Sequence, residues 1–465
     1  MRITAAQRTL GTRLIMGGLV AAGSVVAVTA AAALPWPAVA TPPPALEVTP
    51  VPAETILACD GPVLALGRTV EDAGGLSAAA PSRQTAGNDR GEQPASDALA
   101  QPAVAGEAAA ARFVQKPDGR EPVSVAAASS VRVDEDDLGG YSASACRPPQ
   151  MESWIVGGDT ETGSTGILLL ANPGDVSATV QVTVYGVAGA VTPPGAEAVP
   201  IPPRTQVALP LAGLAGGESR PSLRVTATGA PVRASLQSSI VRTLEPGGID
   251  TQSAVRPATV QVIPGLRVVT DADGAQGASS IARLLSESDT RATITVTKAG
   301  DGAEPARAPE SVALTAGAPL DVDLGALDKG EYTVTVTSEA PLVAAVWHTT
   351  GFGAGSDYAW HTAAPPISDT TLVAVPDGDD ASLNIANPAA QDVTVSVAGQ
   401  GDDPQDVDIA AGDTVVIDVR DDKLYSIDPR GSAVHVSVGF ANESALASVA
   451  VWPDAARPEP VTVYP

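Results

Sequence analysis

The sequence has little of the chemistry that enzymes and cofactor-binding proteins use. Its 465 residues include three His, two Cys and only 3% aromatic residues. It has no G-x-S-x-G elbow, S-x-x-K or H-E-x-x-H motif, phosphate-binding loop or dinucleotide fingerprint, and no Cys/His cluster for metal or redox work. These absences predict a protein that is not an enzyme and that carries no cofactor and no metal.

Basic residues are also scarce, with 27 Lys and Arg against 53 Asp and Glu, for a net charge of −26. A general nucleic-acid binder needs a basic face against phosphate, so this class is excluded. The charge also argues against docking on an anionic lipid surface. Disorder throughout is excluded because 44% of the residues are hydrophobic, close to the globular average.

The N-terminus carries a targeting signal. Arg2, Arg8 and Arg13 are the only charges before an uncharged run of 21 residues, 14–34. A helix of that length spans about 31 Å, which predicts a single-pass membrane anchor with the body outside the cell. The alternative is a signal peptide cleaved near Ala40, after the A-x-A site of residues 38–40. Either reading of residues 1–40 predicts export.

The two cysteines, Cys59 and Cys146, both follow the apolar run. In an oxidising compartment they predict a disulfide that stabilises by about 4–5 kcal/mol; the alternative is two unrelated buried thiols. The surrounding segment, 41–150, is rich in Pro and Ala, and its part 77–121 has almost no aromatic or β-branched residues. We expect a stalk and a disordered loop there.

The remainder repeats. ILLLANPGDVSATVQVTVYG and SLNIANPAAQDVTVSVAG share Ala-Asn-Pro around Asn172 and Asn387, and IARLLSESDTRATITVTKAG has Ser286 at the same place. The endings of the last two units also look alike, with Trp347 and Trp452 in corresponding positions. A period of about 100 residues indicates repeated domains rather than a solenoid. The Asn-Pro pairs predict turns in which Asn bonds its own backbone.

Within each unit, Val, Ile or Leu alternates with Thr, Ser or Gln, as in VTVSVAG and YTVTVTS. This period of two, interrupted by turn signals, predicts an all-β protein of tandem immunoglobulin-like antiparallel β-sandwich domains. The expected domains cover residues 151–265, 266–375 and 376–465.

The order Trp154-Ile-Val-Gly-Gly, LLLANPG, VTVYG and PGGID, which ends at Asp250, resembles an uncharacterised family of exported actinobacterial proteins. That family is known mainly as a domain of unknown function with an N-terminal membrane segment and β-rich repeats. The resemblance implies a cell-envelope location. It brings no established activity and no functional residues.

The densest aromatic cluster lies in 347–361. Its members are Trp347, His348, Asp357, Tyr358, Trp360 and His361. One interpretation is a carbohydrate platform, in which flat rings stack on sugars while Asp and His bond hydroxyl groups. The other is packing between the domains 266–375 and 376–465. His435 is interpreted as an ordinary strand residue.

Carboxylates cluster in turn-like loops, as in Asp271/Asp273, Asp377/Asp379/Asp380, Asp402/Asp403 and Asp421/Asp422. Solvation is their usual role, and calcium binding is the functional alternative. We therefore predict a non-catalytic, exported cell-envelope protein, acting as a structural or interaction module on other envelope proteins. The alternative is a protein that binds cell-wall glycan through the 347–361 cluster. An enzyme with an unrecognised site is the third hypothesis.

Overall fold

The alternating Val, Thr and Ser residues form strands along most of the chain. The computed structural model describes residues 5–33, 46–48, 50–68, 74–106, 109–271, 277–302, 304–457 and 461–463. Two compact units are present, one made of Met1–Pro50 with Glu459–Pro465 and the other of Val51–Pro458. The all-β prediction is confirmed, since the described residues outside α1 (Ala5–Ala33) and the short α2 (Leu211–Ala215) are mainly strands and turns.

The first unit holds α1 and a two-stranded ribbon. In the ribbon, β1 (Leu46–Val48) pairs antiparallel with β35 (Val461–Val463). None of the helices in the described ranges is both long and apolar enough to cross a bilayer. The predicted membrane anchor is therefore not confirmed, and the A-x-A motif at 38–40 lies outside the described residues.

In the Val51–Pro458 unit, four consecutive segments each place strands in two layers, inner and outer, that face each other across an apolar core. We call them segments one to four. In segment one the inner strands are β5 (Arg83–Asn88), β9 (Val125–Glu135) and β10 (Leu138–Ala145), and in segment two they are β12 (Ser164–Asn172), β16 (Thr205–Pro210), β18 (Arg233–Arg242) and β19 (Glu245–Ser253). In segment three they are β21 (Ser279–Ser286), β24 (Leu320–Asp323), β25 (Gly330–Thr349) and β26 (Tyr358–Thr362). In segment four they are β28 (Ala381–Ala386), β31 (Thr414–Asp418), β33 (His435–Asn442) and β34 (Ala445–Ala450).

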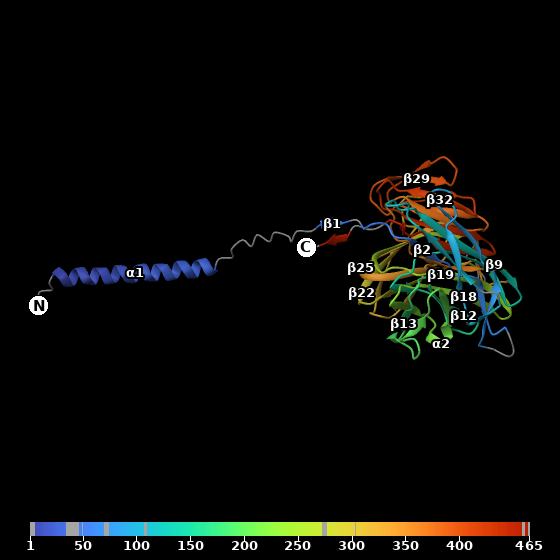
Figure 1. The fold of residues 1–465 in the computed structure, drawn as a ribbon, viewed down its shortest axis with the longest axis horizontal. Helices are drawn as coiled ribbons and strands as arrows, with labels where there is room; N and C mark the ends of the chain where they lie inside the picture. Colours follow the sequence, from blue (N-terminus) through green and yellow to red (C-terminus); the bar gives the residue numbers. More distant parts are fainter. Residues whose placement is uncertain are drawn as a thin grey trace. The chain divides into compact units, whose positions relative to one another are not determined.

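The outer strands cover the other side of each core. In segment one they are β2 (Thr55–Ala58), β6 (Ala95–Ala100) and β8 (Ala109–Gln115), and in segment two they are β11 (Glu152–Ile155), β13 (Ala178–Gly186), β14 (Gly189–Val191), β15 (Val199–Ile201) and β17 (Ser222–Thr228). In segment three they are β20 (Ala258–Val268), β22 (Thr290–Lys298) and β23 (Glu310–Leu314). In segment four they are β27 (Thr371–Val375), β29 (Val393–Gly399), β30 (Gln405–Ile409) and β32 (Lys423–Asp428). A separate three-stranded sheet contains β3 (Val63–Leu66), β4 (Leu76–Ala80) and β7 (Val104–Ala105). In Figure 1, β13 in green, β22 and β25 in yellow and β29 in orange mark segments two, three and four.

The first inner strand of every segment ends in the same kind of turn. The residue that forms this turn with its side-chain oxygen is Asn88, Asn172, Ser286 or Asn387 in segments one to four. Each oxygen accepts a hydrogen bond from the backbone N–H two residues later, from Arg90 at 3.0 Å, Gly174 at 3.1 Å, Ser288 at 3.2 Å and Ala389 at 3.1 Å. The predicted Asn turns are therefore confirmed, and Asn88 shows that the repeat extends into segment one.

Segment one corrects the expectation of a disordered loop over 77–121. This region holds β4 to β8, with Leu99 and Ala110 fully buried. Small side chains allow close packing, and partners from other segments supply the apolar contacts that the region itself lacks. The expected stalk, 41–52, contains β1, while residues 41–45 and 49 lie outside the described part of the chain.

Separate immunoglobulin-like sandwiches in tandem are not established. A parallel contact between β6 and β16 makes one seven-stranded sheet of segments one and two, in the order β19-β18-β12-β16-β6-β8-β2. In segment three the long strand β25 belongs to both layers, because it pairs with β20 and β22 and also with β21 and β26.

The last inner strand of each segment lies at the centre of this unit. Strand β10 packs against β19 and β34, and β26 packs against the same two strands. One strand from each segment therefore surrounds a common axis, as the innermost strands do in a β-propeller.

Candidate functional site

The predicted aromatic cluster lies on β25 and β26, and it is divided between two faces. In the antiparallel ladder Trp347 lies opposite Trp360, and His348 lies opposite Ala359. Because side chains alternate along a strand, Trp347, Tyr358 and Trp360 share one face while His348 and His361 point the other way. The six residues therefore do not form one platform.

The aromatic face borders a cavity of about 400 Å³ between segments two and three. The ring centroids of Trp347 and Tyr358 are 6.0 Å apart. Tyr358 is 1% exposed and donates a hydrogen bond of 2.9 Å from its hydroxyl to Ser238 Oγ. Trp360 is 6% exposed, whereas Trp347 is only partly buried. Trp347 is thus the ring with the largest accessible surface in this cavity.

The polar residues that line the cavity differ in how many internal hydrogen bonds they form. Arg283 binds Asp321 through two hydrogen bonds of 2.7 and 2.9 Å, and its guanidinium lies 5.1 Å from the centroid of the Trp360 ring. Arg283 also donates to the carbonyl oxygen of Gly158 at 2.8 Å, which ties segment three to segment two. This group is already saturated by internal partners.

Three other residues that line the cavity, Asp159, Glu161 and Arg220, are at least partly exposed. The carboxylate of Asp159 accepts hydrogen bonds from the Glu161 N–H at 2.7 Å and from Ser164 Oγ at 3.2 Å. A molecule in the cavity would meet Trp347, these charged groups and the side chain of Ile281.

The two histidines are buried in segment three. His348 Nδ1 lies 2.9 Å from Ser280 Oγ, and the ring centroids of His348 and His361 are 6.3 Å apart. Burial lowers the pKa of His348 to about 4 and that of His361 to about 3. Neither ring nitrogen of His361 has a hydrogen-bond partner among the described residues. Both rings are therefore neutral at physiological pH.

Asp357 lies on the central axis rather than in the cavity, and its side chain is fully buried. Its Oδ2 accepts hydrogen bonds from the backbone N–H of Tyr141 at 2.9 Å and of Leu446 at 3.0 Å. Its Oδ1 accepts from the N–H of Ile249 at 3.2 Å and of Tyr358 at 2.9 Å. Burial raises the pKa of Asp357 to about 8, and the four donors oppose this shift because they favour the charged form.

A second buried carboxylate, Asp250, lies on β19 and accepts a hydrogen bond from the Trp360 N–H at 2.9 Å. Burial raises the pKa of Asp250 to about 7. Gly248, Ile249 and Asp250 belong to the PGGID motif noted above, so that motif marks the axis.

The interpretation of the cluster as packing between 266–375 and 376–465 needs a correction. Trp360 and Tyr358 pack mainly on segment two, in a cluster with Trp154, Val156 and Tyr185. Contact with segment four comes instead through Asp357 and from Ala359, which packs with Ala441 and Leu446. The cavity residues of segment two, such as Asp159 and Arg220, come from distant loops and carry no recognisable motif.

The carboxylate-rich loops contact basic and polar groups. Asp377 pairs with Arg83 at 3.0 Å, and Asp379 pairs with Arg132 at 2.8 Å. Asp402 binds Lys423 at 2.5 Å, and Asp421 accepts from the Gly378 N–H at 3.1 Å. In the part of the chain that the structure describes, no group of three or more His, Cys, Asp or Glu is suited to bind a metal ion. Asp273 lies outside the described residues.

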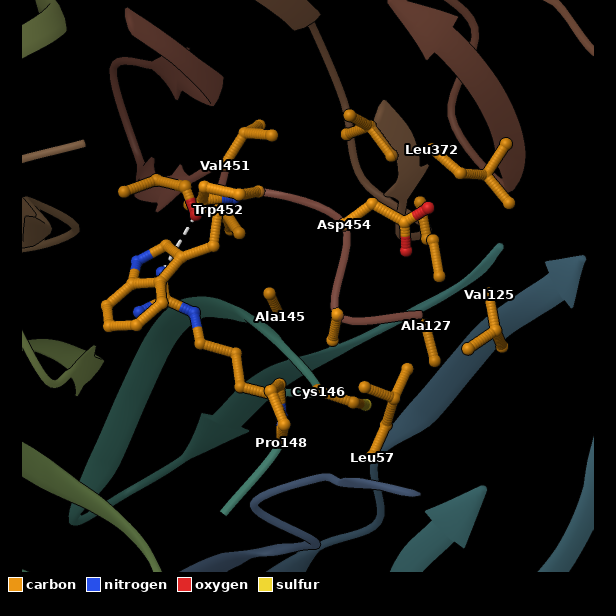
Figure 2. Close-up of a pocket in the computed structure, with 18 residues that line it drawn as sticks. Leu57, Val125, Ala127, Ala145, Cys146, Pro148, Leu372, Val451, Trp452 and Asp454 are labelled. Carbon is orange, nitrogen blue, oxygen red and sulfur yellow. Dashed lines mark hydrogen bonds between the residues drawn. The ribbon is translucent and has the colours of Figure 1, made fainter. Parts of the chain in front are cut away.

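The predicted disulfide is present, and Cys59 and Cys146 have Cα atoms 4.2 Å apart. It lies in the core of segment one, beside a cavity of about 70 Å³. Figure 2 shows Cys146 and Leu57 on one side of this cavity and Val451, Trp452 and Asp454 on the other. Segments one and four therefore meet here.

Buried charges reinforce the junctions of segment one. Arg147 donates to the carbonyl oxygen of Ala254 at 3.0 Å and to that of Ala450 at 2.8 Å, which links segments two and four. Desolvation lowers the pKa of Arg147 to about 9. Asp60, whose pKa is lowered because Arg233 and two hydroxyl groups outweigh its desolvation, binds Arg233 Nη2 at 2.7 Å. Together with Arg283 between segments two and three and Asp357 between segments three and four, these contacts close the four segments into a ring.

Comparison with known proteins gives a family but no activity. Residues 99–420 match the model of a family of unknown function, DUF5719. No curated protein and no solved structure is detectably similar to the chain. The matched region covers segments two and three and parts of segments one and four, more than half of the sequence. The chain therefore belongs to the family of unknown function DUF5719.

Proposed function

We propose that this protein is an exported, non-catalytic component of an actinobacterial cell envelope, where it acts as a structural or interaction module. The signal-like N-terminus and the buried disulfide support export, since structural disulfides persist in oxidising compartments. The resemblance noted from the sequence supports the envelope location.

One observation carries the non-catalytic proposal. Three members of the predicted 347–361 cluster are buried in contacts between segments, namely Asp357, Tyr358 and Trp360. A catalytic group must reach a substrate, whereas these groups join one part of the protein to another. The same contacts join the segments into a closed ring, which suits a scaffold or spacer.

Fractionation of cells that express the tagged chain tests this proposal. We expect the body outside the cytoplasmic membrane, and crosslinking there should capture other envelope proteins. The mature N-terminus distinguishes an anchored chain from one cleaved near Ala40. A body that remains in the cytoplasm with free thiols would overturn the proposal.

The cavity at Trp347 favours a second candidate function, the binding of a cell-wall saccharide. Its volume of about 400 Å³ falls within the usual range for small-ligand sites. The partly exposed ring of Trp347 offers a flat face for a sugar ring, and Asp159, Glu161 and Arg220 offer partners for hydroxyl groups.

Titration with soluble cell-wall glycan fragments tests this second function. We expect Trp347→Ala to abolish a calorimetric binding signal that the unaltered protein gives. Trp452→Phe is the matched control, because Trp452 lies outside this cavity, at the junction of segments one and four. Equal binding by the two variants would contradict a site at Trp347.

A further inference from the structure

The carboxylate of Asp357 is held by one backbone donor from each of the four segments. The donors belong to Tyr141 of β10, Ile249 of β19, Tyr358 of β26 and Leu446 of β34, at 2.9 to 3.2 Å. Each donor lies within the first five residues of its strand, after the connection from the preceding inner strand. The four donors therefore occupy corresponding places in the repeat, although only segment three supplies a carboxylate.

The backbone around this carboxylate leaves no room for another side chain. A Cβ atom at Gly140 would lie 2.7 Å from Asp357 Oδ1, and one at Gly248 would lie 2.5 Å from it. Both glycines have positive φ angles, of 134° and 116°. Across the described residues, Asp357 takes part in no ion pair. The four groups that bind its carboxylate are all hydrogen-bond donors, an arrangement that favours the ionised form.

Convergent backbone N–H groups without a cation are the usual construction of a small anion site. We infer that the axis of this protein is such a site, with Asp357 as its internal ligand. The chemical class that it accepts is a small monovalent carboxylate. The occupant joins all four segments, because the removal of the carboxylate would leave four buried donors without an acceptor.

The surroundings explain why the ligand is a side chain rather than a free ion. Beside the axis lies a cavity of about 650 Å³, lined by Gly140 and Ser356 and by loops from all four segments. Its lining has one basic residue, Arg132, against four acidic residues, Asp134, Glu135, Asp136 and Glu245, and this excess of negative charge repels free anions. A tethered carboxylate avoids this barrier, since its effective concentration at the site is high.

Replacement of the tethered ligand by a free one tests the inference. We expect Asp357→Ala to lower the unfolding midpoint of the full chain. Formate fits the space left by the carboxylate, so we expect the midpoint of this variant to rise with the logarithm of formate concentration. Chloride at the same ionic strength should restore less.

Asp250→Ala is the matched control, because Asp250 is also buried but, within the described ranges, accepts a hydrogen bond from one other strand, β26. Its midpoint should not depend on formate beyond the response of the unaltered protein. An equal formate response in both variants, or none in Asp357→Ala, would overturn the inference.

Asp357→Asn keeps the test decisive if Asp357→Ala does not fold. An amide has nearly the same size but turns two donors toward the backbone donors. We expect this variant to be clearly less stable than the unaltered protein. Equal stability would show that the axis needs only a polar group of this size, and it would refute an anion site.

Discussion

The cores of the segments and the axis between them are stabilised by different interactions. The cores of segments two and four consist almost wholly of Val, Ile, Leu and Ala. The axis instead contains Asp357, Asp250 and the buried pair of Ser142 and Thr251, whose hydroxyl oxygens are 2.9 Å apart. Apolar burial stabilises without direction, whereas hydrogen bonds fix which groups meet. The cores thus stabilise each segment, and the axis specifies the arrangement of the four.

The same contrast governs the response to pH. The axis holds carboxylates whose pKa values are raised by burial. The core of segment two contains no titratable side chain in its apolar cluster. Changes in a core should therefore alter stability equally at every pH, and changes near the axis should not.

The largest effect should come from the core of segment one. Replacement of Cys59 and Cys146 by Ser opens a covalent loop with a sequence separation of 87 residues. In the chain-entropy model, this lowers the free energy of unfolding by about 4–5 kcal/mol. Denaturant unfolding of the double variant beside the oxidised parent measures the loss. An unchanged unfolding free energy would show that the ring contacts alone hold segment one.

A single truncation in another core should cost somewhat less. Leu170 of β12 is fully buried in the core of segment two, so Leu170→Ala should destabilise by about 2–5 kcal/mol. Leu244→Ala is the control, because Leu244 is 82% exposed and its loss should change stability by less than about 0.5 kcal/mol. The cost of Leu170→Ala should be the same at pH 5 and pH 8, and a pH-dependent cost would break the comparison.

At the axis, Asp250→Asn should change the pH profile. The pKa of Asp250 is raised to about 7, so between about pH 4 and 7 the folded chain holds a proton that the unfolded chain has released. The stability of the parent relative to Asp250→Asn should therefore fall as pH rises through this window, by at most about 1.4 kcal/mol per unit. Equilibrium unfolding of both proteins at several pH values measures this slope. A constant difference would show that Asp250 is ionised in the fold.

The smallest effect is expected at His361, and it should be a gain. Both ring nitrogens lack partners among the described residues, so His361→Leu removes a buried polar group that forms no hydrogen bond. We expect about 1 kcal/mol of stabilisation at pH 7.

The gain should grow below pH 6.5. The pKa of His361 is lowered to about 3, so the unfolded parent binds a proton that the folded parent does not. Thermal unfolding at pH 5 and 7 checks both points, with His435→Leu as the control, because His435 does have a partner, the carbonyl oxygen of Ala364 at 2.6 Å. A loss of stability in His361→Leu at both pH values would contradict the assignment of an unpartnered ring.

Local patterns predicted the local parts of this structure well. Alternation located the strands of segments two to four, and Asn172 and Asn387 form the turns expected of them. The repeat in segment one was missed because Asn88 is followed by Asp rather than Pro, and because Ala is the commonest of its buried apolar residues. Its order depends on distant partners such as Arg233, which no local window reveals.

Features that depend on strand register were not predictable in the same way. Trp347 and Trp452 look equivalent by sequence, yet Trp347 lies within β25 opposite Trp360, while Trp452 follows β34. The role of Asp357 depends on three donors that lie 216, 108 and 89 residues away. Composition identified the 347–361 cluster, but only the fold shows that its two faces serve different purposes.

The closed ring also sets an order in time. During synthesis, β10 is complete long before β34 exists, because 305 residues separate Tyr141 from Leu446. The disulfide of segment one can therefore form early, while the last donor to Asp357 arrives only with the C-terminal strands. Until then, one side of segment one lacks its neighbour and remains open to wrong partners. Closure is thus the late, long-range step of folding, and it should limit the rate at which the complete chain becomes native.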